Sequence, residues 1–170
     1  MRSVTYELLG AAVSDVSICA IYLLSPAGEV VSWNRGARQL KGWPSHDITG
    51  LHFSVFYDEE QRAEGVPEKH LTIVRKHGKY AGEGWRIRQD GSAFRASVEI
   101  ESISLNGNER VGFIKIVRDI SAQYKERMAL GIAHQVISRR EADLTTANQL
   151  LDGVFRHTPY ALLLCNTTSG

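Results

Sequence analysis

The fold of this chain is decided by the stretch GWRIRQDGSAFRASV, residues 84–98. Apolar and polar residues alternate on both sides of Gln-Asp-Gly-Ser, which is typical of two antiparallel strands. Asp90-Gly91 supplies the two positive-φ positions that a two-residue turn needs. The pattern therefore predicts a β-hairpin that places Trp85 and Ile87 on the same face as Phe94.

Outward from this hairpin, alternation and turn residues predict an antiparallel sheet of five strands. The strands are expected at about 18–24, 29–33, 83–88, 93–103 and 110–118, with a turn at 25–28 joining the first two. Short helical turns over 35–50, with Ser45 as an N-cap, and a longer helix over 67–77 that ends at Gly78 should flank the sheet. This order of elements predicts an α+β fold.

Composition narrows the class of protein. The 170 residues, 43% of them hydrophobic, suit one domain with an extension. A net charge of +1 gives no global attraction to nucleic acid or to an anionic membrane, so neither partner is expected. The sequence shows no apolar run of membrane-spanning length and no secretory signal pattern, which predicts a cytoplasmic protein. Cys19 and Cys165 have no cysteine neighbour and are expected to be inert.

Beyond Ser121 the periodicity changes to alternating steps of three and four. The repeat comprises Leu130, Ala133, Ile137, Arg140, Leu144, Ala147, Leu151 and Val154. Such a seam predicts a helix that pairs with a second copy as a coiled coil, with Arg140 as a polar position that fixes register or weakens pairing. The alternative is an ordinary amphipathic helix that folds back on its own domain.

The predicted organisation has four parts. A leading helix covers 1–12, the domain covers 13–121, and the linker helix covers 122–156. Residues 157–170 repeat the pattern of residues 13–28, in which a helix end is followed by a polar kink, an apolar strand and a glycine. We therefore expect a second copy of the domain to begin at 157.

Several short motifs, taken in order, carry a family resemblance. They are Trp33-Asn34, Gly42-Trp43, Ile48-Thr49-Gly50, Gly84-Trp85-Arg86, Arg88-Gln89-Asp90-Gly91-Ser92, Gly112-Phe113 and Arg118-Asp119-Ile120-Ser121. Together, over residues 13–121, they resemble the PAS domain family. The resemblance implies a non-catalytic sensory and dimerisation module of a bacterial signalling protein, such as a histidine kinase or a diguanylate cyclase.

The resemblance also implies how a signal would leave the domain. The helix that follows Asp119, Ile120 and Ser121 looks like the signalling helix of the family. It would relay a change in the sheet to an output domain of the same protein, with Leu130, Ile137, Leu144 and Leu151 along the paired seam. His134 lies in a stretch that faintly resembles a phospho-acceptor helix, but the residues that normally follow that histidine are missing.

The sequence alone does not decide which ligand, if any, the domain binds. The cysteine that binds flavin in blue-light PAS domains is missing from residues 50–54, and neither His70 nor His77 lies where haem-binding members place their ligand. Redox-sensing members that bind FAD resemble this chain in their tryptophans and asparagine, which makes Trp33, Asn34, Phe53 and Trp85 candidate pocket residues. The alternatives are a small metabolite, or a ligand-free spacer whose side chains fill the core and whose Asn34 caps a turn.

Overall fold

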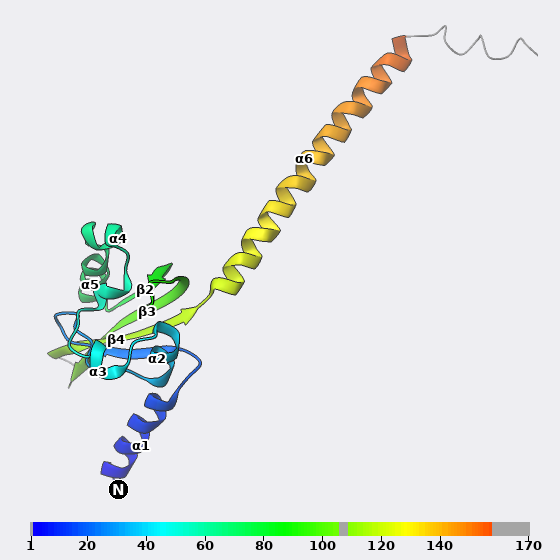
Figure 1. Ribbon diagram of the computed structural model, residues 1–170. Helices are drawn as coiled ribbons and strands as arrows, with labels where there is room; N and C mark the ends of the chain where they lie inside the picture. Colours follow the sequence, from blue (N-terminus) through cyan, green and yellow to red (C-terminus); the bar gives the residue numbers. More distant parts are fainter. Residues whose placement is uncertain (1, 106–108, 158–170) are drawn as a thin grey trace, which may run out of the picture. The chain divides into compact units, whose positions relative to one another are not determined.

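The computed structural model describes residues 2–105 and 109–157, and its centre is an antiparallel sheet of four strands (Figure 1). The strands are β1 (Ala20–Leu24), β2 (Lys79–Ile87), β3 (Ala93–Leu105) and β4 (Glu109–Asp119). Their spatial order is β1-β4-β3-β2, so the first strand of the chain lies beside the last. The predicted α+β class is confirmed.

The expected fifth strand, residues 29–33, is wrong as a strand. The turn before it forms, with Gly28 at φ 88°, but the segment makes only isolated bridges from Glu29 and Val30. The reason lies in two polar side chains. The backbone N–H of Leu23 donates to Ser32 Oγ at 3.0 Å, and that of Ile21 donates to Asn34 Oδ1 at 2.9 Å. Side chains thus take the place of the carbonyls that would continue the ladder.

The central hairpin forms, but its register differs from the prediction by one residue. Arg88 N donates to Ser92 O at 2.9 Å, so three residues, not two, form the loop, and Gly91 takes φ 82°. Three-residue loops that end in a left-handed residue are a common alternative to the two-residue turn. A shift of one residue moves every side chain of a strand to the other face. Arg86 therefore pairs with Phe94.

The predicted inward position of Trp85 is wrong for the same reason. Trp85 pairs with Arg95, so it lies on the face opposite Phe94 and stays 41% exposed. Arg86 is buried in its place. The core-facing positions of β2 before Arg86 are Tyr80, Gly82 and Gly84, and the side chains of Tyr80 and Arg86 occupy the space beside the two glycines.

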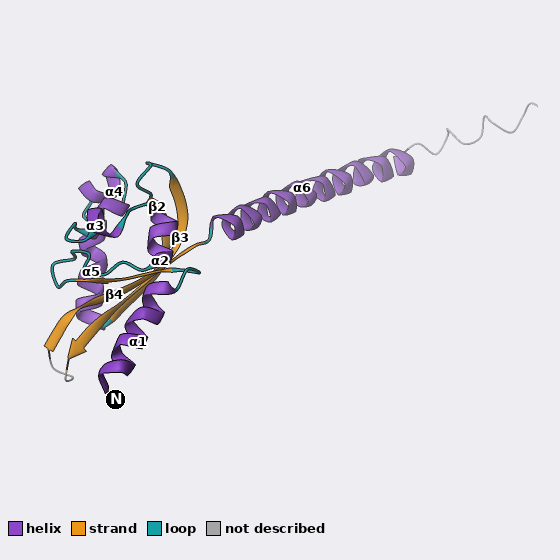
Figure 2. Cartoon of the chain, turned by 60° about the horizontal axis from the view of Figure 1, so that its bottom comes forward, coloured by secondary structure: helices purple, strands orange, loops and turns teal. Residues whose placement is uncertain are grey.

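Short helices cover the core face of the sheet (Figure 2). They are α2 (Arg35–Lys41), α3 (Ser45–Ile48), the 3₁₀ turn η1 (Phe53–Phe56), α4 (Glu59–Ala63) and α5 (Val66–His77). α5 ends at Gly78 in the left-handed region, as predicted. Ser45 is the first residue of α3 and not its cap, because Pro44 holds the N-cap position.

Two helices lie outside this layer of short helices. α1 (Arg2–Asp15) precedes the sheet, and α6 (Ser121–His157) runs for 37 residues. The chain divides into two compact units, residues 1–124 and 125–170. Most of α6 belongs to the second unit, where its apolar seam residues are exposed, at 65% for Leu130 and 64% for Leu144. The expected start of a second domain falls on 158–170, outside the described residues. None of the described helices could cross a membrane.

Candidate functional site

Three cationic side chains are buried on the helix-covered side of the sheet. Lys41 at the end of α2, Arg86 on β2 and Lys115 on β4 are exposed by 0%, 3% and 1%. We call these three residues the basic core. A helix end and two strands that are not neighbours in the sheet bring them inside, so the fold as a whole assembles this group.

Each cation of the basic core lies against an aromatic ring from η1 or the residue after it. Lys41 Nζ is 3.9 Å from the ring centre of Phe56, and Lys115 Nζ is 4.1 Å from that of Phe53. The guanidinium carbon of Arg86 is 4.0 Å from the ring centre of Tyr57. Cation–π contacts of this kind contribute up to about 2 kcal/mol each when desolvated.

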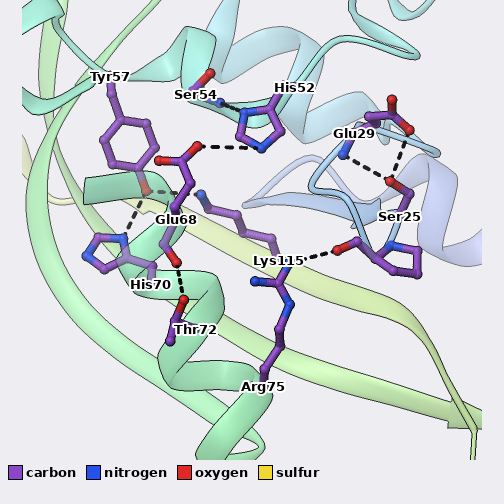
Figure 3. A network of polar contacts seen from close by, with 11 residues as sticks. Ser25, Glu29, His52, Ser54, Tyr57, Glu68, His70, Thr72, Arg75 and Lys115 are labelled. Atoms are coloured by element: carbon purple, nitrogen blue, oxygen red, sulfur yellow. Dashed lines mark hydrogen bonds and ion pairs between the residues drawn. The ribbon is translucent and has the colours of Figure 1, made fainter. Parts of the chain in front are cut away.

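No carboxylate of the described residues pairs with the basic core, whose donors are left poorly satisfied. The ion pairs of residues 2–105 and 109–157 all lie elsewhere. Lys41 Nζ and Arg86 Nε have no hydrogen-bond partner there, and Arg86 Nη1 donates to the carbonyl of Trp85. Lys115 Nζ points to the Tyr57 hydroxyl at 3.5 Å (Figure 3). The interior therefore offers hydrogen bonds that the protein itself does not use.

Burial without an acid shifts the protonation of the two lysines. Desolvation, followed by the charge of Arg86, holds the pKa of Lys41 and that of Lys115 well below their usual value. Arg86 cannot lose its charge in this way, because a guanidinium stays protonated in proteins. Burying an ion costs several kcal/mol, more than one ring face returns. Burial of the basic core therefore lowers the stability of the folded domain.

A tyrosine and a histidine form the edge of this interior (Figure 3). The Tyr57 hydroxyl lies 3.1 Å from Nδ1 of His70, and the imidazole stacks on Tyr80 with ring centres 4.1 Å apart. Burial, then the charges of Lys115 and Arg86, lower the pKa of His70 to about 4. Burial also raises the pKa of Tyr57 to about 12. Both groups are neutral at pH 7, so neither balances the cations.

The structure brings two of the four predicted pocket residues to this interior. Phe53 is fully buried over Lys115. Trp33 packs on Phe56 and Tyr22, with ring centres 5.7 and 4.9 Å away, and donates from Nε1 to the carbonyl of Trp43 at 2.9 Å. Aromatic side chains thus fill this side of the domain.

Asn34 has a structural task that uses its whole carboxamide. Oδ1 accepts from the N–H groups of Ala37 and Ile21, at 2.7 and 2.9 Å, and thereby caps α2. Nδ2 donates to the carbonyls of Val16 and Cys19, at 2.9 and 3.1 Å. All four hydrogen bonds of an amide are made within the chain. Trp85, the fourth candidate, packs against Tyr124 on the opposite face of the sheet, 5.7 Å between ring centres.

Sequence reasoning missed the basic core, although one member left a signal. In the run Phe113-Ile114-Lys115-Ile116-Val117 the period of a strand places Lys115 on the same side as Phe113 and Val117, which are buried. A lysine on the apolar side of a strand is a mark of an unusual interior. Arg86 was hidden by the error in the hairpin turn.

A second group of contacts fixes the start of α6 to the domain. Asp119 Oδ1 accepts from the N–H of Ser121 at 2.8 Å, and Asp119 Oδ2 pairs with Arg88 Nη2 at 2.8 Å. Arg88 Nε also donates to the carbonyl of Leu40 in α2 at 2.9 Å. Ser121 Oγ accepts from the N–H of Arg95 at 3.0 Å. Arg88 thus joins the end of α2, beside Lys41, to residues 119–121 at the start of α6, which we call the root of α6.

Comparison with known proteins agrees with this architecture. The fold, a twisted antiparallel sheet with short helices on one face and a long helix after the last strand, defines a class of sensory domains. The family model described as PAS fold matches residues 8–120. The chain therefore belongs to the PAS-fold family, whose members are sensory modules of signalling proteins.

Individual relatives point the same way. Two-component system protein A of Emericella nidulans is 37% identical over 139 residues, which make up 82% of this chain and 20% of that protein. The chain thus spans about a fifth of that relative. A PAS domain from Colwellia psychrerythraea superposes with a TM-score of 0.62 at 22% identity, covering 69% of this chain and 98% of that one.

A domain of a sensory box sensor histidine kinase/response regulator from Geobacter sulfurreducens gives a TM-score of 0.57 at 14% identity. It covers 67% of this chain and 94% of the other. At these identities the two structures show a shared fold alone.

The basic core predicts an unusual dependence of stability on pH. The unfolded chain keeps Lys41 and Lys115 protonated up to about pH 10.5, whereas burial lowers both pKa values in the folded state. The unfolded state then binds more protons, so the free energy of unfolding should rise from about pH 7 to about pH 9.5, by up to about 1.4 kcal/mol per pH unit for each lysine. Above pH 10 it should fall, because folded Tyr57, with a pKa of about 12, keeps its proton. Urea unfolding followed by tryptophan fluorescence measures this.

A pair of variants isolates the cause of this slope. Lys115→Met should reduce the rise with pH, while Lys69→Met, which removes an exposed lysine of α5, should leave it as in the wild type. A wild-type stability that stays level or falls from pH 7 to 9.5 would contradict the assignment of two buried lysines with lowered pKa values.

Proposed function

We propose that this chain is the sensory input module of a two-component signalling protein, most closely of the histidine kinase type. In this proposal the domain dimerises and passes its state through α6 to an output domain of the same protein. The observation that carries the proposal is the root of α6, where Asp119 and Ser121 are bonded both to the sheet and, through Arg88, to α2. The name of the Emericella nidulans relative adds support.

The seam of α6 supports dimerisation through this helix. Apolar residues at steps of three and four give a period of 3.5, which suits a left-handed pair of helices. These residues are largely exposed in the part of the chain that the structure describes, with Ile137 and Leu151 both at 55%. A second copy of the same helix would bury them. Arg140 on the seam is followed by Glu141 and Asp143 in sequence, so carboxylates accompany its charge.

The contacts of Arg88 support a route for the signal. Its guanidinium carbon lies 4.3 Å from the ring centre of Phe94, a core residue, while its nitrogens bond to α2 and to Asp119. A displacement of α2 or of the hairpin would change the Arg88–Asp119 pair, and with it the hydrogen bond that Asp119 accepts from Ser121 at the start of α6. A paired helix has discrete arrangements, so a small change at its root biases one arrangement over another.

Dimerisation through the seam predicts opposite results for two isoleucines of α6. Ile137→Glu places a charge on the seam and should weaken the dimer at least tenfold, because like charges would be buried against each other. Ile132→Glu makes the same change at a position off the seam that is 59% exposed, and should leave the dimer intact. Sedimentation equilibrium of the full chain gives both dissociation constants. A monomeric wild type, or equal effects of the two variants, would contradict the proposal.

The route through Arg88 predicts a local effect of its removal. Arg88→Met keeps an apolar stem on Phe94 but loses the bonds to Leu40 and Asp119. Hydrogen exchange of the Ile120 and Tyr124 amides, which bond to the carbonyls of Arg95 and Ile120, should become about tenfold faster.

The matched control for this route is Arg118→Met, which breaks a comparable pair with Glu99 at 2.7 Å on β3 and should leave exchange at the root of α6 unchanged. Unchanged exchange at Ile120 and Tyr124 in Arg88→Met would show that this arginine does not hold the helix root.

A further inference from the structure

The interior of the domain contains donors that lack acceptors. Lys41 Nζ and Arg86 Nε have no partner among the described residues, and Lys115 Nζ reaches the Tyr57 hydroxyl at a long 3.5 Å. All of these atoms donate hydrogen bonds, and the guanidinium of Arg86 keeps its charge whatever the protonation of the two lysines. The complement that would satisfy them is a set of oxygen acceptors with negative charge.

Two features of the protein reduce this mismatch without removing it. Loss of a proton from each lysine would remove two charges, but it leaves the guanidinium of Arg86, which does not titrate. The rings of Phe53, Phe56 and Tyr57 offer their faces to the three cations, yet a ring accepts no full hydrogen bond from a buried Nζ or Nε. An acceptor from outside the chain would complete the site.

We propose that the basic core is the binding site of a small anion with carboxylate or phosphate oxygens, held by Lys41, Arg86 and Lys115. The inference rests on the proposed sensory function, because it names the class of ligand that the sensor reads. η1 and Tyr57 place aromatic rings against the cations, so these rings would form the apolar surroundings of the anion.

Most groups that face the site add no negative charge to compete with such an anion. The exception is Glu68 of α5, a 58% exposed carboxylate whose charge acts on Tyr57. Tyr22 from β1, Tyr57 after η1 and His70 from α5 are neutral at pH 7, because burial keeps the two phenols protonated and holds the pKa of the imidazole near 4. Arg88 from the hairpin contributes a further positive charge near Lys41. Positive groups therefore surround Lys41 and Lys115, while Glu68 contributes a negative charge near Tyr57.

Occupation of this site has a direct path to the helix root. The carbonyl of Lys41 accepts a hydrogen bond from the N–H of Gln89 at 2.9 Å, and Arg86 is two residues before Arg88. Drawing Lys41 and Arg86 toward one anion would therefore act on the end of α2 and on β2. These are the two elements that Arg88 connects to Asp119.

Calorimetric and thermal titrations of the full chain test the proposal. Sodium phosphate and disodium succinate are the probes, with sodium chloride holding the ionic strength constant, and they separate a phosphate ligand from a carboxylate ligand. We expect at least one probe to raise the Tm by about 5 °C at tenfold excess over its Kd. Binding should also take up protons from the buffer, because the anion restores the charge of the lysines.

Substitution of one cation gives a result that simple destabilisation cannot mimic. Lys115→Met removes a buried amine with poorly satisfied hydrogen bonds and nearly keeps the length of the side chain, so its Tm without anion should be higher than that of the wild type. Its affinity for the anion should be about tenfold lower or worse, because one charge-assisted bond is lost. Lys69→Met, on the exposed side of α5, should match the wild type in both measurements.

Two results would overturn the inference. One is an anion effect of equal size in the wild type and in Lys115→Met, which would place the anion elsewhere. The other is no effect of either probe, together with no stoichiometric organic acid or phosphate in the mass spectrum of denatured protein purified from cells. If either occurs while Ile137→Glu still dissociates the dimer, the ligand class fails and the signalling role stands. If the chain binds the anion but never dimerises, the ligand class stands and the proposed signalling role through the paired helix fails.

Discussion

The pairing of Arg86 with Phe94 across the central hairpin is the constraint on which the interior of this domain depends. It turns one strand of the sheet so that an arginine faces the core and a tryptophan faces outward. Gly84 accommodates the result, since a Cβ there would lie 2.7 Å from Arg86 Nη1, where the guanidinium folds back along the strand. With Lys41 and Lys115 beside it, a core that is otherwise aromatic and aliphatic acquires a concentrated positive charge.

This charge links the basic core to the start of α6. Natural interiors rarely retain unpaired cations, because desolvation exceeds what ring faces return. Here Lys41 and Arg86 lie at the ends of α2 and β2, close in sequence to the contacts of Arg88, the residue that bonds to both α2 and Asp119. A charge imbalance in the core is thus placed where its relief would act on the start of α6. Features that lower stability in this way are common at functional sites.

Much of the architecture was predictable from the sequence, and the failures have physical causes. Alternation found β1, β3 and β4, and glycine marked the end of α5, since both signals are local. The fifth strand failed because Ser32 and Asn34 side chains replace backbone acceptors, a substitution that periodicity does not reveal. Trp85 was placed on the wrong face because Gln-Asp-Gly fits a loop of two or of three residues, and the choice depends on packing across the whole sheet.

The candidate site was harder to predict than the fold for a related reason. The sequence predicted aromatic residues and Asn34 as ligand contacts, yet the carboxamide of Asn34 is hydrogen-bonded to α2 and β1. The cations are assembled by tertiary structure from positions 41, 86 and 115, and one strand register decides whether the second of them is inside.

The most direct test of the central claim is a crystal structure of the full chain purified without added anions. We expect electron density of a non-protein anion within hydrogen-bonding distance of Lys41 Nζ, Arg86 Nε and Lys115 Nζ. Three cations turned out to solvent, or paired with carboxylates of the chain itself, would contradict it.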